Sequence, residues 1–283
     1  MTIKTIAVIG AGSMGQGIAQ VCAAAGYRVL FYDLDLSVVE RGINSIARNF
    51  DQAIAKGKST AELKNKTLQQ IRAVRLEEVK ADLIIEAVVE KLNVKQDIFL
   101  KLEKINSSET ILASNTSSLS ISNIGSVLEH PNRFLGLHFF NPAHLMKLVE
   151  VIAGEKTSPS TLAQLVDFVR SIGKTPVEVK DSPGFIVNRV ARHYYLEALK
   201  LLEENVADMG TIDALTKSAG FKLGPFELMD LIGNDVNLEV SRLMYESFGK
   251  VPRFKPNKIQ EEKVKAGQLG KKTGKGYYHY EGK

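Results

Sequence analysis

Cysteine is nearly absent from this chain of 283 residues, in which Cys22 is the single thiol. One cysteine has no partner within the chain, so a framework of intrachain disulfide bonds is excluded. Chains without disulfides are typical of reducing compartments, and we therefore expect a cytoplasmic protein.

Long apolar runs and a dominant sign of charge are also missing. No stretch reaches the ~18 uninterrupted apolar residues of a membrane span, and no apolar run has the flanks of a signal peptide, so we expect no membrane partner. The 37 Lys and Arg residues exceed the 32 Asp and Glu residues by 5. That excess is too small to indicate nucleic-acid binding, but it suits a small anionic ligand.

The first two thirds of the chain alternate short β-branched runs with helical segments. This alternation predicts an α/β domain with a doubly wound, mostly parallel sheet covered on both faces. A long polar segment, residues 37–68, reads as helical. We expect strands at residues 3–10, 27–33, 81–90, 134–140, 146–154 and 174–181, and a strand followed by a loop over residues 110–117.

The pattern changes at "DSPGFIVNRV", where Ser182 and Pro183 have the residue types of a helix start. From there the chain reads as helical to its end, with residues 225–249 as one continuous helical segment. We therefore predict a dinucleotide-binding domain of residues 1–181, of Rossmann type, followed by an all-helical domain of residues 182–283.

A glycine loop joins the first expected strand to the first helix and has the form GxGxxG. In such a loop the first glycine permits the turn, the second lets the backbone approach a pyrophosphate, and the third lets helix and strand pack closely. Asp33 ends the next expected strand, where it would accept hydrogen bonds from a ribose 2′-OH and favour NAD over NADP. The alternative is a plain glycine turn beside a solvated aspartate. The expected cofactor residues here are Gly10, Gly12, Ser13, Met14, Gly15 and Asp33.

His138 and Glu150 lie inside two neighbouring apolar runs, where an unpaired charge would be costly. If the two strands run side by side, Glu150 can accept the Nδ1–H of His138 and leave Nε2 to exchange a proton with a substrate hydroxyl. A structural His–Glu pair without chemistry is the alternative. The other four histidines lack a carboxylate of this kind in a nearby strand.

Polar side chains follow the run "ILA" in "ASNTSSLSI". Loops at the carboxyl ends of strands are where doubly wound sheets bind ligands, so Asn115 and Ser117 are candidate site residues. Asn141 and Asn188 add amide donors further along the chain. Each of these residues could instead serve only in a turn or a helix cap.

Several motifs together resemble the L-3-hydroxyacyl-CoA dehydrogenases, and most closely the bacterial 3-hydroxybutyryl-CoA dehydrogenases. The similarity spans essentially the whole chain in order. It implies an NAD-dependent enzyme acting on an acyl-CoA, with a helical C-terminal domain that forms a homodimer and no metal site. The motifs are "GAGSMGQGIA", "EAVVE", "ASNTSSLSI", "GLHFFNPAHLMKLVEV", "KDSPGFIVNRV", "GPFELMDLIG" and "GKKTGKGYY".

The resemblance also assigns roles to single residues. His138 matches the catalytic histidine and Glu150 its acidic partner, while Ser117, Asn141 and Asn188 match polar residues around the reacting carbon. Glu90, Lys95 and Lys275 match residues on the cofactor side, and the basic hairpin with Lys56 and Lys58 matches the segment that reaches towards coenzyme A.

These roles predict hydride transfer between C3 of a 3-hydroxyacyl-CoA and NAD, with His138 as general acid and base. Two alternatives stay open. One is a dehydrogenase of a hydroxy acid or sugar acid without CoA on the same fold. The other is a protein that binds NAD without turnover.

Overall fold

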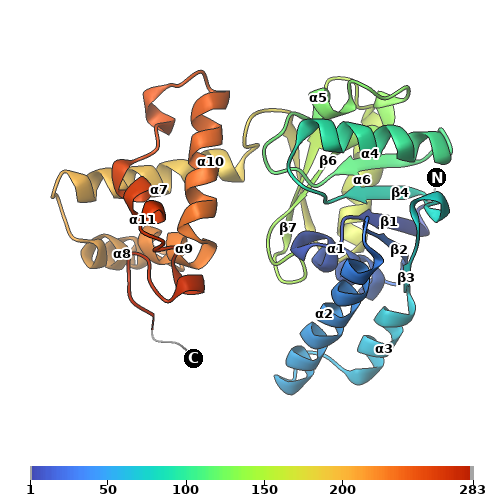
Figure 1. The fold of residues 1–283 in the computed structure, drawn as a ribbon, viewed down its shortest axis with the longest axis horizontal. Helices are drawn as coiled ribbons and strands as arrows, with labels where there is room; N and C mark the ends of the chain where they lie inside the picture. The colour runs from blue at the N-terminus through green and yellow to red at the C-terminus, as the bar shows by residue number, and fades with distance from the viewer. Residues whose placement is uncertain (1, 281–283) are drawn as a thin grey trace. The chain divides into compact units, whose positions relative to one another are not determined.

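A computed structural model describes residues 2–280 of the chain. The chain divides into two compact units, Met1–Ser182 and Pro183–Lys283 (Figure 1). Each unit has its own buried core.

The first unit contains one eight-stranded sheet with the order β3-β2-β1-β4-β5-β6-β7-β8. Every neighbouring pair is parallel except β6 and β7, which are antiparallel. The carboxyl ends of β1, β2, β4, β5 and β6 therefore meet at one edge. The strands are β1 (Thr5–Ile9), β2 (Arg28–Tyr32), β3 (Ile71–Ala73), β4 (Leu83–Glu86), β5 (Ile111–Ser114), β6 (Phe134–Phe139), β7 (Leu148–Ala153) and β8 (Thr175–Lys180).

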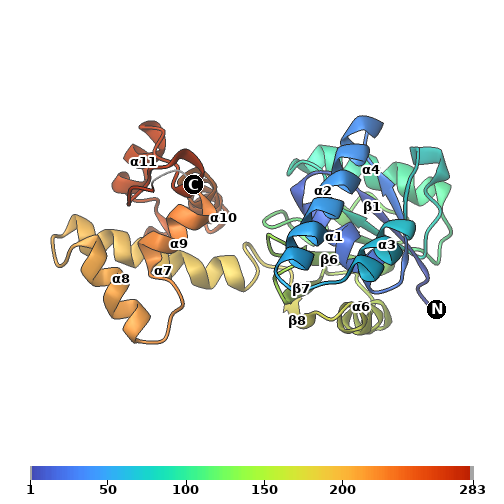
Figure 2. The ribbon, with the colours of Figure 1, turned by 90° about the horizontal axis from the view of Figure 1, so that it is seen from below.

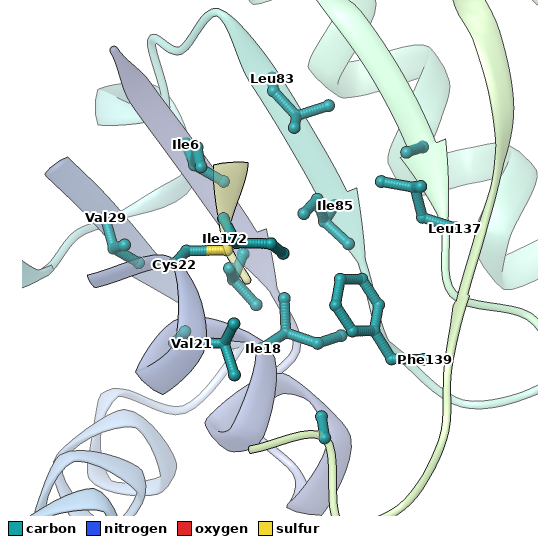
Figure 3. Close-up of a cluster of buried hydrophobic side chains, with 14 of the residues drawn as sticks. Ile6, Ile18, Val21, Cys22, Val29, Leu83, Ile85, Leu137, Phe139 and Ile172 are labelled. Carbon is teal, nitrogen blue, oxygen red and sulfur yellow. The ribbon is translucent and has the colours of Figure 1, made fainter. Parts of the chain in front are cut away.

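Helices cover both faces of this sheet. On one face, α1, α2 and α6 enclose the main hydrophobic cluster together with alternate residues of the strands. Figure 3 shows part of this cluster, with Ile18, Val21 and Cys22 of α1 beside strand residues. Phe99 and Leu102 of α4 are buried separately from that cluster. The helices of this unit are α1 (Ser13–Ala24), α2 (Leu36–Ala55), α3 (Ala61–Gln69), α4 (Leu92–Ile105), α5 (Ile121–Gly125) and α6 (Pro159–Ser171).

The long polar helical segment forms two helices, α2 and α3, in agreement with the expected hairpin. Gly57 has a φ of 65°, which ends α2, and the Thr60 hydroxyl accepts a hydrogen bond from the Leu63 N–H, which starts α3. The resulting α2–α3 hairpin projects beyond the sheet (Figure 1). Helix α6 lies beside β8 (Figure 2).

Two strands differ from the sequence prediction. Strand β4 ends at Glu86, four residues before the expected end, because the chain turns there into a loop that precedes α4. The edge strand β3 was not predicted, since its residues are partly exposed and carry no apolar alternation.

The second unit is a group of helices around a core formed by α7, α8, α9 and the C-terminal segment. An expected continuous helix over residues 225–249 is broken at Gly233, whose φ of 105° is open to glycine but strained for other residues. No helix within residues 2–280 is long and apolar enough to cross a membrane. The helices are α7 (Val187–Glu203), α8 (Met209–Ser218), α9 (Pro225–Ile232), α10 (Asn234–Ser247) and α11 (Lys258–Lys265).

Candidate active site

His138 and Glu150 face each other across the only antiparallel pair of the described sheet. Leu137 and Phe139 point into the main hydrophobic cluster (Figure 3), so strand alternation directs His138 to the opposite face. The register places His138 directly beside Glu150, and Nδ1 of the imidazole lies 2.7 Å from Oε2 of the carboxylate. His138 is 6% exposed and Glu150 is fully buried.

This geometry defines which nitrogen can do proton chemistry. A carboxylate against Nδ1 stabilises the tautomer with a proton on Nδ1, so Nε2 is the basic nitrogen. When Nε2 takes up a second proton, the buried Glu150 charge stabilises the imidazolium. The pair can therefore exchange a proton with a hydroxyl or carbonyl oxygen placed against the ring.

Two of the three glycines of the loop, Gly10 and Gly15, are closely packed, and Gly12 is open. A Cβ on Gly15 would lie 1.7 Å from the Gly10 carbonyl oxygen, and one on Gly10, at a φ of 102°, would lie 2.6 Å from the Ala87 oxygen. Beside Gly12, in contrast, no atom lies within 4 Å of the Cβ position. The backbone at Gly12, with Ser13 and Met14 in the first turn of α1, is thus open to the approach of a phosphate group.

Asp33 follows β2 and braces this loop. Its Oδ2 accepts a hydrogen bond of 2.7 Å from the Ala11 N–H, whereas Oδ1 makes no hydrogen bond to the described part of the chain. The carboxylate is therefore held at the carboxyl edge of the sheet with one oxygen available for a ribose hydroxyl. This arrangement and the room beside Gly12 both fit NAD.

A polar network links the loop after β4 to the loop after β5. Lys95, 1% exposed on α4, lies 2.6 Å from a Glu86 oxygen and 3.2 Å from Oε2 of Glu90. Burial acts to raise the pKa of Glu90, but the Lys95 charge and hydroxyl donors outweigh burial and hold that pKa below its ordinary value. Glu90 and Lys95, two predicted cofactor residues, thus form an ion pair at the sheet edge.

The loop after β5 is held by the Glu90 carboxylate. Oε1 of Glu90 accepts hydrogen bonds from the Thr116 hydroxyl, the Ser117 N–H at 2.9 Å and the Ser118 hydroxyl at 2.9 Å. Oδ1 of Asn115 accepts from the Phe139 N–H at 2.8 Å and so ties the end of β5 to the end of β6. Ser117 therefore lies in the loop after β5, and His138 lies on the neighbouring parallel strand β6.

Glu86 was missed as a site residue by the sequence interpretation. Its segment, "EAVVE", reads as one apolar strand, yet Glu86 is fully buried and bonded to both Lys95 and Ser114. The signal that singled out His138, an ionisable residue inside an apolar run, was equally present here.

A hollow of about 720 Å³ opens beside the α2–α3 hairpin. It lies between that hairpin, the end of α1, the loop after β6 and the turn after α6, and Lys56, Lys58, Lys174 and His144 are among its lining residues. Burial lowers the pKa of Lys174, whose ammonium donates to the carbonyl oxygens of Ala143 and Met146 at 2.7 Å each. The loop after β6, which carries the exposed Asn141, is thereby fixed.

Two candidate residues belong to the second unit, and their roles remain predictions. Asn188 lies in the first turn of α7. Lys275 is exposed in the C-terminal segment, where it forms backbone bridges with Gly270 and His279. That segment is anchored by Asp230, whose carboxylate accepts from the Tyr277 and Tyr278 N–H groups at 2.9 Å.

The parallel sheet, the glycine loop between β1 and α1 and the aspartate after β2 define a dinucleotide-binding protein of the Rossmann class. Residues 5–182 match the family model of the 3-hydroxyacyl-CoA dehydrogenase NAD-binding domain, and residues 184–280 match that of the C-terminal domain. The chain belongs to the 3-hydroxyacyl-CoA dehydrogenase family. The predicted family, fold class and cofactor, NAD, are therefore confirmed.

Individual relatives agree with this family. The chain is 45% identical over 285 residues to the 3-hydroxyadipyl-CoA dehydrogenase of Escherichia coli K12, covering 99% of itself but only 60% of that protein. It is 39% identical to the 3-hydroxybutyryl-CoA dehydrogenase of Clostridioides difficile, with 97% and 99% covered. The crystal structure of the (S)-3-hydroxybutyryl-CoA dehydrogenase of Ralstonia eutropha superimposes with a TM-score of 0.94 at 38% identity, covering 99% of this chain and 100% of that one.

Proposed function

We propose that the protein interconverts (S)-3-hydroxyacyl-CoA and 3-ketoacyl-CoA thioesters, with 3-hydroxybutyryl-CoA and acetoacetyl-CoA as the main pair. The observation that carries this proposal is the buried contact of 2.7 Å between Nδ1 of His138 and Glu150, at the sheet edge that also holds the glycine loop. A protein that only bound NAD would have no need of a proton acceptor there.

In the proposed reaction, the glycine loop and Asp33 would hold NAD, which would supply the hydride chemistry at C3 of the substrate. His138 removes the proton of the 3-hydroxyl in oxidation and returns it to the developing alkoxide in reduction. Ser117 donates a hydrogen bond to the oxygen on which negative charge develops, a contribution that is usually large. Asn188 keeps the polar role that the family resemblance assigns to it. Glu150 holds the imidazole in position and stabilises its protonated form.

The basic hollow supports a CoA thioester over a free acid. Lys56 and Lys58 are exposed at the tip of the α2–α3 hairpin, and both line the hollow together with Lys174. Ammonium groups bind phosphates as point charges, and free hydroxy acids carry no phosphate that would use them. We therefore assign this side of the first unit to the phosphate-bearing part of CoA.

The decisive experiment follows NADH absorbance with a series of 3-ketoacyl substrates. Acetoacetyl-CoA should be reduced with a kcat/KM well above that of free acetoacetate, and NADH should be preferred to NADPH because of Asp33. The series should include 3-ketoadipyl-CoA, since one relative is named for a dicarboxylic acyl-CoA. Equal rates with the free acid would reject the CoA assignment, and NADH binding without any turnover would favour the non-catalytic alternative.

We also propose that the protein is a cytoplasmic homodimer joined through its second unit. Several large apolar side chains of that unit are exposed, among them Val190 at 66%, Phe221 at 53% and Leu231 at 53%. Exposed apolar groups of this size are typical of a contact surface. Light scattering coupled to size-exclusion chromatography should give a molar mass twice that of the chain. A Phe221→Glu variant should have a lower measured molar mass.

A further inference from the structure

Glu86 is a fully buried carboxylate at the centre of the sheet that none of the roles above uses. In the register it stands between Ile9 of β1 and Ser114 of β5, so it lies between the strand of the glycine loop and the strand that leads to Ser117. Its Oε1 accepts from the Lys95 ammonium at 2.6 Å and from the Val88 N–H at 2.7 Å. Its Oε2 accepts from the Ser114 hydroxyl at 2.6 Å.

The orientation of the Glu90 carboxylate depends on where the Lys95 ammonium is held. Lys95 touches Oε2 of Glu90 at 3.2 Å, a longer contact than the 2.6 Å that it makes with Glu86. The hydrogen bonds that the Thr116–Ser118 loop donates to Glu90 all converge on the other oxygen, Oε1. One oxygen of Glu90 thus binds the cation while the other holds the loop.

Stability alone is a poor explanation of this network. A single carboxylate would neutralise Lys95, yet two carboxylates surround it, and the second one costs desolvation energy. Buried ion pairs can often be replaced by apolar residues without loss of stability. What Glu86 adds is a second attraction, which keeps the ammonium at the sheet and prevents it from drawing the whole Glu90 carboxylate out of the loop.

We propose that Glu86 is a positioning residue. By anchoring Lys95 it fixes the orientation of Glu90 and, through Glu90, the Thr116–Ser118 loop on the cofactor side of the site. The inference rests on the proposed function only in assigning this loop to the NAD side. Glu86 itself needs no contact with the cofactor or the substrate.

The test is a fluorescence titration of the full chain with NADH, in the absence of any acyl-CoA. Glu86→Gln keeps the size of the side chain and removes its charge. The dissociation constant of NADH should rise about tenfold, the order expected for one hydrogen bond to a charged group.

Asp82→Asn is the matched control. Asp82 lies at the opposite end of the same strand, where it accepts from the Lys4 and Thr5 N–H groups at 2.8 and 2.9 Å, and its replacement should lower the melting temperature while leaving NADH affinity within about twofold.

Two further variants keep the inference open to refutation. Ser114→Ala removes one donor to Glu86 and the acceptor of the Thr116 N–H, leaves the ion pair in place and should weaken NADH binding about threefold. If Glu86→Gln does not fold, NADH affinity unchanged in Ser114→Ala would overturn the positioning role. In a double variant with Lys95→Met, the Glu86 substitution should have little further effect, because it acts through Lys95.

NADH affinity close to wild type in folded Glu86→Gln, or an equal loss in Asp82→Asn, would overturn the positioning role. The result of the NADH titration is independent of the test of the proposed function. Failure of the wild-type protein to turn over acetoacetyl-CoA would leave the NADH titration unaffected.

Discussion

Replacement of Glu150 by Gln tests the proton chemistry most directly. The substitution preserves the size of the side chain and the buried position beside His138, but it removes the charge that lies 2.7 Å from Nδ1. Because both residues are almost fully buried, solvent cannot replace that charge. We expect kcat for acetoacetyl-CoA reduction to fall while the dissociation constant of NADH stays nearly constant.

The size of the effect follows from the hydrogen bond that is lost. A hydrogen bond to a charged group contributes roughly 1.5–3 kcal/mol. Each 1.36 kcal/mol of transition-state stabilisation corresponds to about a factor of ten in rate, so kcat should fall roughly 10- to 100-fold. If the Gln amide turned its NH2 group towards Nδ1, the imidazole would adopt the wrong tautomer and the loss would be larger.

The assay is steady-state oxidation of NADH with saturating acetoacetyl-CoA. Glu178→Gln serves as the matched control, since Glu178 lies on the neighbouring strand β8 beside Val151 and is exposed. It should leave kcat unchanged. A folded Glu150→Gln variant with kcat within about twofold of the wild type would refute the idea that Glu150 orients and stabilises the general acid.

Four other predictions concern the cofactor loop, the buried thiol and the hairpin. Asp33→Ala should raise the KM for NADH about tenfold, because the glycine loop loses its hydrogen bond to Asp33 and the ribose loses its acceptor. An unchanged KM would contradict the role of Asp33 in cofactor binding. Gly15→Ala should abolish NADH binding, since the new Cβ would lie 1.7 Å from the Gly10 oxygen; normal binding would show that the loop can repack. Burial raises the pKa of Cys22 from 9.0 to about 12, so its thiolate becomes appreciable only as the pH rises towards that value. A disulfide reagent at neutral pH should therefore label Cys22 only after unfolding, and rapid labelling of the native protein would contradict this. Lys56→Met should raise the KM for acetoacetyl-CoA several-fold, which corresponds to about 1 kcal/mol of binding free energy. The effect should be smaller at high salt, and the KM for NADH should not change.

Local sequence patterns determined most of the secondary structure and the core of the candidate site. The glycine loop is read from residues that are contiguous in the chain, because its function depends on backbone conformations that only glycine adopts readily. The pairing of His138 with Glu150 was also within reach, since the two strands follow one another and a buried charge needs a partner. The family resemblance then supplied Glu90 and Lys95.

Other features depended on contacts between distant parts of the chain. The sequence shows Glu86 only as one residue of an apolar run, and its place beside Ser114, 28 residues away, follows from the pairing of β4 with β5. The single expected helix over residues 225–249 is divided at Gly233 because the backbone there takes a positive φ, which helical periodicity does not encode.

The sequence by itself thus determined most of the candidate site residues, because backbone conformation and the cost of burying charge act over short distances. The tertiary structure decided which of those residues are joined and in what orientation: the order of the strands brings the carboxylates of β4 and its loop to a single lysine, and the register alone sets the imidazole of β6 against the acid of β7. Strand order and register depend on the packing of the entire sheet, and no short segment of the chain contains that information.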